Sequence, residues 1–286
     1  MSLVEALLLR GGVCVKQYAY KPWKFYALTM LATWVAWFLA AYFSYQTGKE
    51  PIMILLTITG SVAPFVVGLF MVYGSGSAAL KRDFLIRLLQ VNRVGLRHFP
   101  TILLLLPVSL LVAVAISVLF GKSTTQFMLV SELSLLIPIL APTFEEIGWR
   151  GYGVDSLRSR YNLLTASLLF ALLWALWHVP LFFINTYYQN ELWKMGIPYV
   201  LNFLVSLVPF TIIVNWLYYR ANRSILAAIL FHVVAVVSPE AFRVEESTKF
   251  IQTGILVVIA VSIVAKDLAF FTADSTPGLV GSRRSA

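Results

Sequence analysis

Long apolar runs with few charges set the strongest limit on how this chain folds. A transmembrane helix needs about 20 consecutive, mostly apolar residues, and 59% of the 286 residues are hydrophobic. Only 12% are charged, about half the share of a soluble domain. The sequence therefore predicts an all-α, polytopic membrane helical bundle of about eight transmembrane helices, at residues 25–45, 52–73, 100–120, 126–145, 162–185, 198–219, 224–239 and 250–271.

The basic residues between these runs predict the orientation. Cytoplasmic loops of membrane proteins carry an excess of Lys and Arg. With the N-terminus inside, the inner segments hold 17 of the 22 basic residues, and the outer loops hold Lys49, Lys122, Lys194, Arg243 and Lys249. Both termini are therefore expected in the cytoplasm, with the protein in the cell membrane of a prokaryote or the endoplasmic reticulum of a eukaryote. The net charge of +9 fits contact with anionic membrane lipids, and its spread over short loops argues against nucleic-acid binding.

Two segments outside the runs carry further expectations. Residues 80–98 are too charged to span, and apolar side chains recur there at helical spacing, namely Leu80, Phe84, Leu88, Val91 and Val94. This pattern predicts an interfacial amphipathic helix that either lies on the inner membrane surface or docks on the bundle. Residues 1–271 are expected to form a single domain. Residues 272–286, rich in small and turn-forming residues, are expected to form a disordered tail.

Few ionisable side chains lie in or at the edge of the apolar runs. An ionisable group in the hydrocarbon region costs a few kcal/mol unless it faces a partner or a cavity. A lone histidine in a span is more often structural than catalytic, but two histidines together with a spare glutamate favour a functional site. Besides the membrane-edge pair Lys266 and Asp267, the ionisable residues are Glu132, Glu145, Glu146, His178 and His232.

The first polar cluster lies in the stretch APTFEEIGWRGY, residues 141–152. Glu146 and Arg150 are four residues apart, the spacing of an ion pair on one helix face. Glu145 projects about 100° away and has no local counter-charge. The pair alone also fits a solvated salt bridge at a helix end. Because Pro142 has no N–H to donate, the helix is expected to bend or loosen just before the carboxylates.

The second and third clusters hold the histidines. In LLWALWHVPLFFIN, Trp174 and His178 lie four residues apart on one helical face, and Asn185 follows near the same face. His232 lies near the middle of the seventh run. A glutamate with two histidines permits either a His₂Glu zinc site with an open water position or activation of water without metal. The H-E-x-x-H pair of helical zinc proteases is absent, and the single cysteine, Cys14, excludes a cysteine-only metal site.

These residues resemble the motifs of the type II CAAX endopeptidases and their bacterial relatives, the CPBP or Abi intramembrane proteases. The stretch EEIGWR fits the E-E-x-x-x-R motif of that family. His178 fits the histidine of the second motif, F-x-x-x-H, and His232 begins the last motif, H-x-x-x-N or H-x-x-x-D. The order and approximate spacing of the motifs agree with the family from about residue 20 to 271.

Two positions depart from the family pattern. Trp174 stands where the second motif has phenylalanine, and Val236 stands where the last motif has Asn or Asp. In the family that polar side chain is thought to help the histidine hold the oxyanion, and valine has no hydrogen-bonding group. Three alternatives follow: another donor such as Asn215 or Asn185 substitutes, His232 acts alone, or this member is slow or inactive. Loss of one oxyanion donor typically lowers the rate by about 10²–10³-fold.

The resemblance implies an intramembrane endopeptidase that removes the C-terminal tripeptide from prenylated C-a-a-X substrates. Glu145 would activate the water with the assistance of His178, and His232 would hold the oxyanion. Glu146 and Arg150 would hold the geometry of the site. No cofactor is implied, and the positive charge of Arg150 disfavours a divalent cation beside the carboxylates.

Other functions stay open on the sequence alone. They are a protease of unprenylated peptides, as in bacteriocin processing, a non-enzymatic scaffold or immunity protein of the same fold, and a transporter or proton relay, for which intramembrane Glu and His are equally suitable.

The motifs and the predicted spans conflict in one respect. His178 lies 16 residues into the run that begins at Asn162, about 24 Å up a straight helix. Glu145, in contrast, ends the run 126–145 at its inner side. The two side chains meet only if the fifth helix starts below the membrane or tilts strongly, or if the fourth helix extends further inward than predicted.

Overall fold

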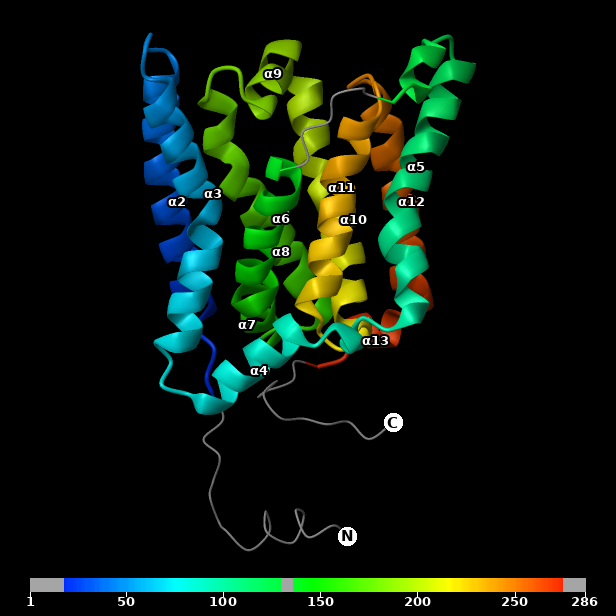
Figure 1. Ribbon diagram of the computed structural model, residues 1–286. Coiled ribbons are helices and arrows are strands. Elements are labelled where there is room, and N and C mark those ends of the chain that lie inside the picture. Colours follow the sequence, from blue (N-terminus) through cyan, green and yellow to red (C-terminus); the bar gives the residue numbers. More distant parts are fainter. Residues whose placement is uncertain (1–17, 130–135, 275–286) are drawn as a thin grey trace, which may run out of the picture.

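The computed structural model describes residues 18–129 and 136–274, and every regular element within these ranges is a helix. The long helices run side by side as one bundle, and the described chain starts and ends at the same end of it (Figure 1). The predicted all-α membrane bundle is therefore confirmed. Helix α13 (Leu268–Thr272) reaches the start of the predicted tail. Cys14, Glu132 and residues 275–286 lie outside the described ranges.

Within the described residues, six helices are long and apolar enough to cross a membrane. A seventh, α11, is apolar but shorter, as the marginal hydropathy of its run suggests. The six are α2 (Pro22–Ser44), α3 (Glu50–Tyr73), α5 (Phe99–Leu119) with the turn before it, α8 (Leu163–His178) with the 3₁₀ turn η5 (Val179–Phe183), α10 (Ile197–Arg220) and α12 (Thr248–Lys266); the seventh is α11 (Ile225–Ala241).

The fourth helix differs most from its prediction at residues 126–145. Residues 124–127 form the short 3₁₀ turn η3 (Thr124–Phe127), and helix α6 (Leu136–Gly148) follows later in the chain. It passes without a break into a π-helical turn, η4 (Trp149–Gly153), and then into α7 (Val154–Arg158). Gly148 permits close contact with α3, because a Cβ atom there would lie 2.3 Å from the Pro64 carbonyl carbon. The fourth helix is thus shifted toward the charged end of its segment.

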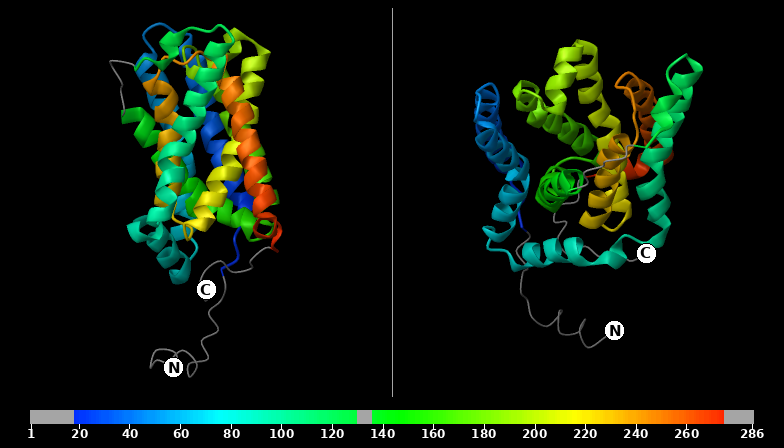
Figure 2. Two further views of the ribbon diagram at one scale, coloured as in Figure 1. Left: turned by 90° about the vertical axis from the view of Figure 1, so that its right-hand side faces the viewer. Right: turned by 45° about the horizontal axis from the view of Figure 1, so that its top comes forward.

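Helix α4 (Ala78–Leu89) crosses beneath the bundle, between α3 and α5 (Figure 2). The Ser77 hydroxyl caps its first turn by accepting a hydrogen bond from the Leu80 amide at 3.2 Å. Leu80 and Phe84 are buried as the periodicity predicts, and Phe84 would lie 2.8 Å from a Cβ atom at Gly151 of the π turn. Of the two sequence alternatives, α4 is therefore the docked one. It ends at Leu89, earlier than the predicted residue 98.

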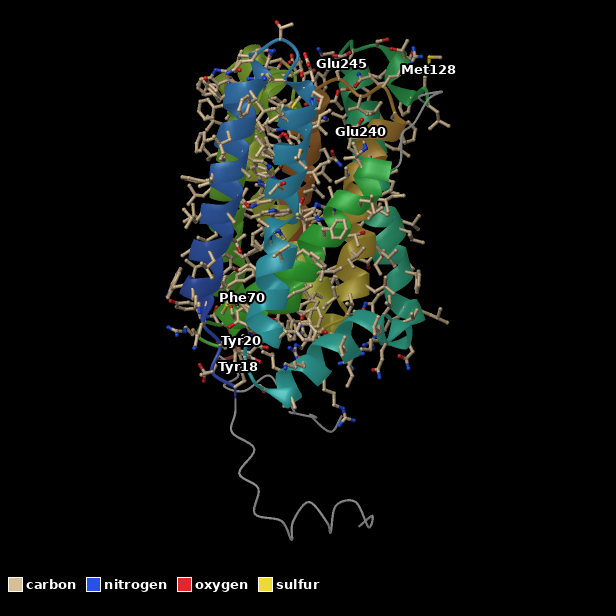
Figure 3. The ribbon with its side chains drawn as sticks, turned by 60° about the vertical axis from the view of Figure 1, so that its left-hand side comes forward. Tyr18, Tyr20, Phe70, Met128, Glu240 and Glu245 are labelled. Atoms are coloured by element: carbon tan, nitrogen blue, oxygen red, sulfur yellow. The ribbon has the colours of Figure 1, made fainter. Side chains whose placement is uncertain are left out.

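The flanks and ends of the bundle differ in chemistry. Large apolar side chains project outward from α2, α3, α5 and α12, as expected for surfaces in contact with lipid. Tyr18 and Tyr20 lie at the end that holds α4, while Glu240 and Glu245 lie at the opposite end (Figure 3). The short helix α9 (Tyr188–Met195) also lies at that opposite end (Figure 1).

Candidate active site

The length of the fourth helix resolves the depth conflict between Glu145 and His178. From Glu145 the helix continues for 13 residues through η4 and α7 to Arg158, a rise of about 20 Å. His178 ends α8, 15 residues after Leu163, a rise of about 22 Å. The two side chains therefore lie at a similar depth inside the bundle. Of the three explanations left open by the sequence, the inward extension of the fourth helix accounts for this.

Glu146 lies at the centre of a buried charge cluster. Its Oε1 atom accepts a hydrogen bond from Arg150 at 2.7 Å and one from Nδ1 of His232 at 2.9 Å. Arg150 also donates to the side-chain oxygen of Asn215 at 3.2 Å. Glu146, Arg150 and Asn215 have no exposed surface, so the alternative of a solvated salt bridge is wrong. The cluster instead fixes the position of the His232 ring.

Glu145 is directed away from this cluster, as the helical geometry predicts. Its Oε2 atom accepts a hydrogen bond from Nε1 of Trp174 at 3.3 Å. It forms no ion pair with any described residue and keeps 9% of its surface exposed. Oε2 of Glu146 also has no hydrogen-bond partner among the described residues, but it is fully buried. Of the two adjacent carboxylates, Glu145 is therefore the one with surface accessible to a water molecule.

Trp174 lies between Glu145 and both histidines. Its ring centroid is 5.5 Å from that of His178 and 5.3 Å from that of His232. Nδ1 of His178 lies 2.7 Å from the Trp174 carbonyl oxygen. Because a carbonyl only accepts, this nitrogen carries the proton, and Nε2 of the neutral ring is left as an acceptor. Trp174, which stands where the family motif has phenylalanine, thus contacts all three proposed catalytic residues, Glu145, His178 and His232.

The two asparagines suggested as oxyanion donors do not face this space. The Asn215 amide donates to Ser167 at 3.0 Å while its oxygen binds Arg150. Asn185 lies beyond η5, where its side-chain oxygen accepts from exposed Lys194 at 3.4 Å. The choice of either asparagine as the oxyanion donor stays a prediction that these contacts do not support. Asn215 supports Arg150, and Asn185 belongs to the end of the bundle near α9.

A cavity begins at the cluster and runs along α10 toward the opposite end from α4. His232 and Trp174 line its deep part together with Phe210, Val236 and Ser206. At its other end it is lined by Tyr188, Glu246 and Lys249, which contact one another. Glu145 and His178 border this space through Trp174 rather than lining it.

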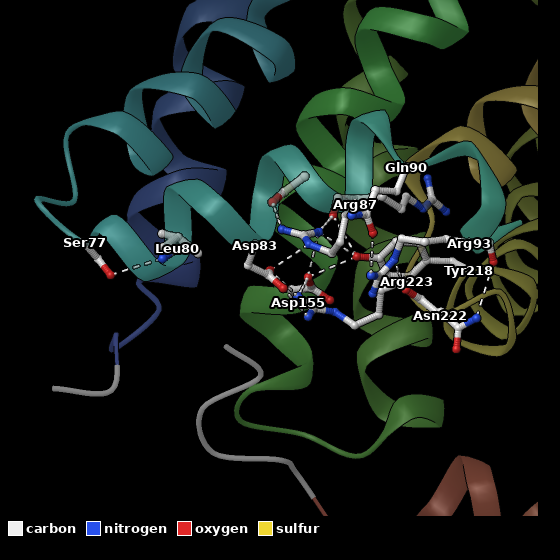
Figure 4. Close-up of polar contacts among 12 residues, drawn as sticks. Ser77, Leu80, Asp83, Arg87, Gln90, Arg93, Asp155, Tyr218, Asn222 and Arg223 are labelled. Carbon is white, nitrogen blue, oxygen red and sulfur yellow. Dashed lines mark hydrogen bonds and ion pairs between the residues drawn. The ribbon is translucent and has the colours of Figure 1, made fainter. Parts of the chain in front are cut away.

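A second polar network, missed by the sequence reasoning, supports the site from the α4 side (Figure 4). Arg87 is fully buried and donates to the carbonyl oxygens of Arg150 at 2.8 Å and Gly151 at 3.0 Å, both in the π turn. Tyr218 donates to the Arg150 carbonyl at 3.1 Å, and Asp155 pairs with Arg87 at 3.0 Å. Asp83 and Arg223 complete the network. The π turn that carries Arg150 is thus held from below by α4.

Metal ligation was the second chemical option for a glutamate and two histidines. No group of three or more His, Cys, Asp or Glu side chains within the described ranges is placed to share an ion. Nδ1 of His232 and Oε1 of Glu146 are directed at each other rather than at a common point. The prediction of hydrolysis without metal therefore remains a prediction, to be tested by chelation.

Taken together, the fold and the site define an integral membrane protein with a buried Glu–His cluster suited to hydrolysis. Residues 127–238, which include Glu145, His178 and His232, match the family model described as type II CAAX prenyl endopeptidase Rce1-like. The chain is also 37% identical over 265 residues to CAAX prenyl protease 2 of Methanococcus maripaludis, covering 90% of this chain and 98% of that protein.

The chain therefore belongs to the type II CAAX prenyl endopeptidase family. It is a membrane endopeptidase of this class, which confirms the interpretation based on the three motifs and favours it over the scaffold and transporter alternatives.

Proposed function

We propose that this protein removes the C-terminal tripeptide from prenylated C-a-a-X proteins within the membrane, and that Glu145 is its base. The observation that carries the assignment is the different surroundings of the two adjacent carboxylates. Glu146 is bound to Arg150 and His232, whereas Glu145 has no ion-pair partner among the described residues and lies beside Trp174. A base needs a free lone pair within hydrogen-bond reach of water, and Glu145 meets this requirement.

In the proposed reaction Glu145 first accepts a proton from water and later returns it to the leaving amine. Glu145 takes a proton from water, oriented by a hydrogen bond to Nε2 of His178, and the hydroxide adds to the scissile carbonyl carbon. His232, with Nδ1–H directed at Glu146, donates from Nε2–H to the developing oxyanion. When the intermediate collapses, the C–N bond breaks and protonated Glu145 returns its proton to the amine of the released tripeptide.

For His232 to donate from both ring nitrogens it must be the imidazolium. Glu146 stabilises that cation directly, because its Oε1 atom lies 2.9 Å from Nδ1. Arg150 in turn keeps Glu146 ionised, since their contact of 2.7 Å is fully buried. In this proposal the two adjacent glutamates have separate roles: Glu145 carries the proton, and Glu146 holds the donor of the oxyanion site.

We also propose that both termini are cytoplasmic, as the distribution of basic residues favours. The described chain begins and ends at the α4 end, where the arginine-rich segments gather. In this orientation the part of the cavity lined by Tyr188 and Lys249 faces away from the cytoplasm. A cytoplasmic substrate then reaches His232 between the helices rather than through that end.

The direct test is cleavage of a farnesylated C-a-a-X peptide by purified protein in detergent or liposomes. We expect release of the tripeptide by the wild type and none above background by Glu145→Gln. The same peptide without the farnesyl group serves as the comparison. Cleavage of the unprenylated peptide alone would replace the proposed substrate class by that of a general peptide-processing protease. Failure to cleave either peptide would contradict the proposed function.

A further inference from the structure

The deep part of the cavity lacks the polar side chain that the last motif normally supplies beside its histidine. Val236 lies one helical turn after His232 on α11 and lines the same cavity, but it has no hydrogen-bonding group. The Asn215 amide donates to Ser167, and Asn185 lies beyond η5, where its side-chain oxygen accepts from Lys194. If the proposed hydrolysis takes place here, a second donor to the oxyanion comes from another cavity residue.

Helix α10 presents one face to the two histidines. The ring of Phe203 lies 5.2 Å from that of His178, and the ring of Phe210 lies 5.3 Å from that of His232. Ser206 follows Phe203 by three residues and precedes Phe210 by four, so all three share one helical face. Its side chain also lines the cavity. The Ser206 hydroxyl therefore faces the space between the two histidines.

Ser206 also lies at the height of Val236. Helix α10 descends toward the α4 end and α11 returns from it (Figure 1). Phe210 and His232 are in ring contact, which sets a common level for the two helices. Four residues before Phe210 on α10 and four residues after His232 on α11 both rise about 6 Å from that level. Ser206 and Val236 thus line the cavity at matching positions on the two helices.

The other polar side chains along the cavity fit this role less well. The Gln252 amide donates to Ser109 on α5 at 3.3 Å. Asn202 lines the cavity, but it is eight residues from Phe210 on α10, a rise of about 12 Å. Ser238 is six residues after His232 on α11, a rise of about 9 Å, and Thr253 on α12 donates to the carbonyl oxygen of Lys249 at 2.9 Å, at the other end of the cavity. On α10 and α11, Ser206 is therefore the cavity-lining hydroxyl or amide closest to the level of His232.

From these positions we infer that Ser206 donates the second hydrogen bond to the oxyanion, in place of the side chain that Val236 lacks. Without substrate its hydroxyl donates to the Phe203 carbonyl at 2.7 Å. That carbonyl also accepts the helical N–H of Leu207, so the hydroxyl can rotate away without leaving it unpaired. A bond to a charged oxygen is roughly twice as strong as one to a neutral carbonyl, which favours rotation as the oxyanion forms. Ser206 keeps its proton throughout.

This inference rests on the proposed function and is tested by comparing variants under one assay. Ser206→Ala should lower kcat by about 10²–10³-fold, the usual cost of one oxyanion donor, with KM changed by less than about threefold because the interaction forms only in the transition state. Ser206→Thr, which keeps the hydroxyl, should stay within about tenfold of the wild type. Ser262→Ala is the matched control, since Ser262 makes the same kind of backbone bond at 2.7 Å on the exposed face of α12.

Rescue separates a catalytic role from a structural one. Introducing Val236→Asn into Ser206→Ala restores the family's polar side chain and should recover at least tenfold in kcat. The inference is overturned by a Ser206→Ala variant as fast as Ser262→Ala, or by a loss that Val236→Asn does not restore.

A readout without turnover keeps the inference testable even if the peptide is not a substrate. A farnesylated C-a-a-X peptide with a phosphinate in place of the scissile amide carries the tetrahedral anion, and Ser206→Ala should weaken its binding by about 10²–10³-fold. Binding of the uncleaved amide peptide should be unchanged. Equal affinity of the wild type and Ser206→Ala for the phosphinate contradicts the role of Ser206. A wild type that cleaves neither the farnesylated nor the unprenylated C-a-a-X peptide contradicts the proposed function.

Discussion

Replacing each of the two adjacent glutamates by glutamine should separate stability from activity. Glu146→Gln removes the charge that Arg150 and His232 bind at 2.7 and 2.9 Å and leaves a fully buried guanidinium without its counter-ion. Breaking a buried ion pair by changing one partner costs about 3–5 kcal/mol. At roughly 2–4 °C per kcal/mol for a large domain, this corresponds to a fall in Tm of about 6–20 °C.

Glu145→Gln should behave in the opposite way. Glu145 has no ion pair to lose, and a glutamine oxygen can still accept the hydrogen bond of the Trp174 indole. We therefore expect a Tm within about 2 °C of the wild type, because the substitution keeps the side-chain shape and that hydrogen bond and removes a buried carboxylate that has no counter-ion among the described residues. Loss of the general base should lower kcat by about 10²–10⁴-fold or more.

The assay combines thermal unfolding in detergent with peptide cleavage well below the Tm of each variant. Glu191→Gln provides the matched control, because Glu191 pairs with Lys194 at 2.8 Å in a half-exposed position, and such a pair contributes about 0–1 kcal/mol. A Glu146→Gln protein as stable as Glu191→Gln, or a Glu145→Gln protein as fast as the wild type, would refute the division of roles.

Three further predictions concern the support, the chemistry and the orientation of the site. Arg87→Lys should lower both Tm and kcat, because an ammonium cannot reproduce the planar fork that binds two carbonyls of the π turn; a variant that matches the wild type in both measurements would contradict this. Exhaustive chelation should leave peptide cleavage unchanged and metal analysis should find no stoichiometric zinc, whereas activity lost on chelation and restored by zinc would establish a metal mechanism. In a Cys14→Ser background, a membrane-impermeant thiol reagent applied from outside intact cells should label Arg243→Cys but not Arg82→Cys, and the reverse pattern would invert the proposed orientation.

Apolar runs were sufficient to predict most of the helices, because a helix that crosses the membrane needs about 20 consecutive, mostly apolar residues. They failed for the fourth helix. The run 126–145 ends where charged residues begin, yet the helix continues through Arg150 and Asp155 to Arg158. Hydropathy scores each charge as though it stood alone, whereas Arg150 and Asp155 are buried with partners from distant segments, Asn215 on α10 and Arg87 on α4. Only the three-dimensional pairing makes these charges compatible with the interior.

The site itself was predicted from motif spacing to a different extent for each residue. The contrast between Glu145 and Glu146 followed from the 100° step of a helix and needed no tertiary information. The contacts of Asn215 with Arg150 and Ser167 did not follow from the sequence, because α10 is apolar on several faces and its pattern does not indicate which face meets the histidines. Arg87 was missed for a related reason: in the sequence it is one of several basic residues of an amphipathic helix, and nothing local marks it as the buried one.

The π turn η4 has a consequence for comparing relatives of this chain. In it the Val154 amide reaches back to the Trp149 carbonyl, five residues earlier, so the turn holds one residue more than an α-helix would. A relative shorter by one residue between Arg150 and Asp155 would keep the spacing of its Glu-Glu-Arg motif. Because the π turn takes up that extra residue, such a relative would close the turn as a regular α-helix and keep the directions of the later side chains, so the position of Asp155 would still meet Arg87. A gap at this point of an alignment therefore marks a π turn replaced by an α turn, with the contact between α4 and this segment preserved.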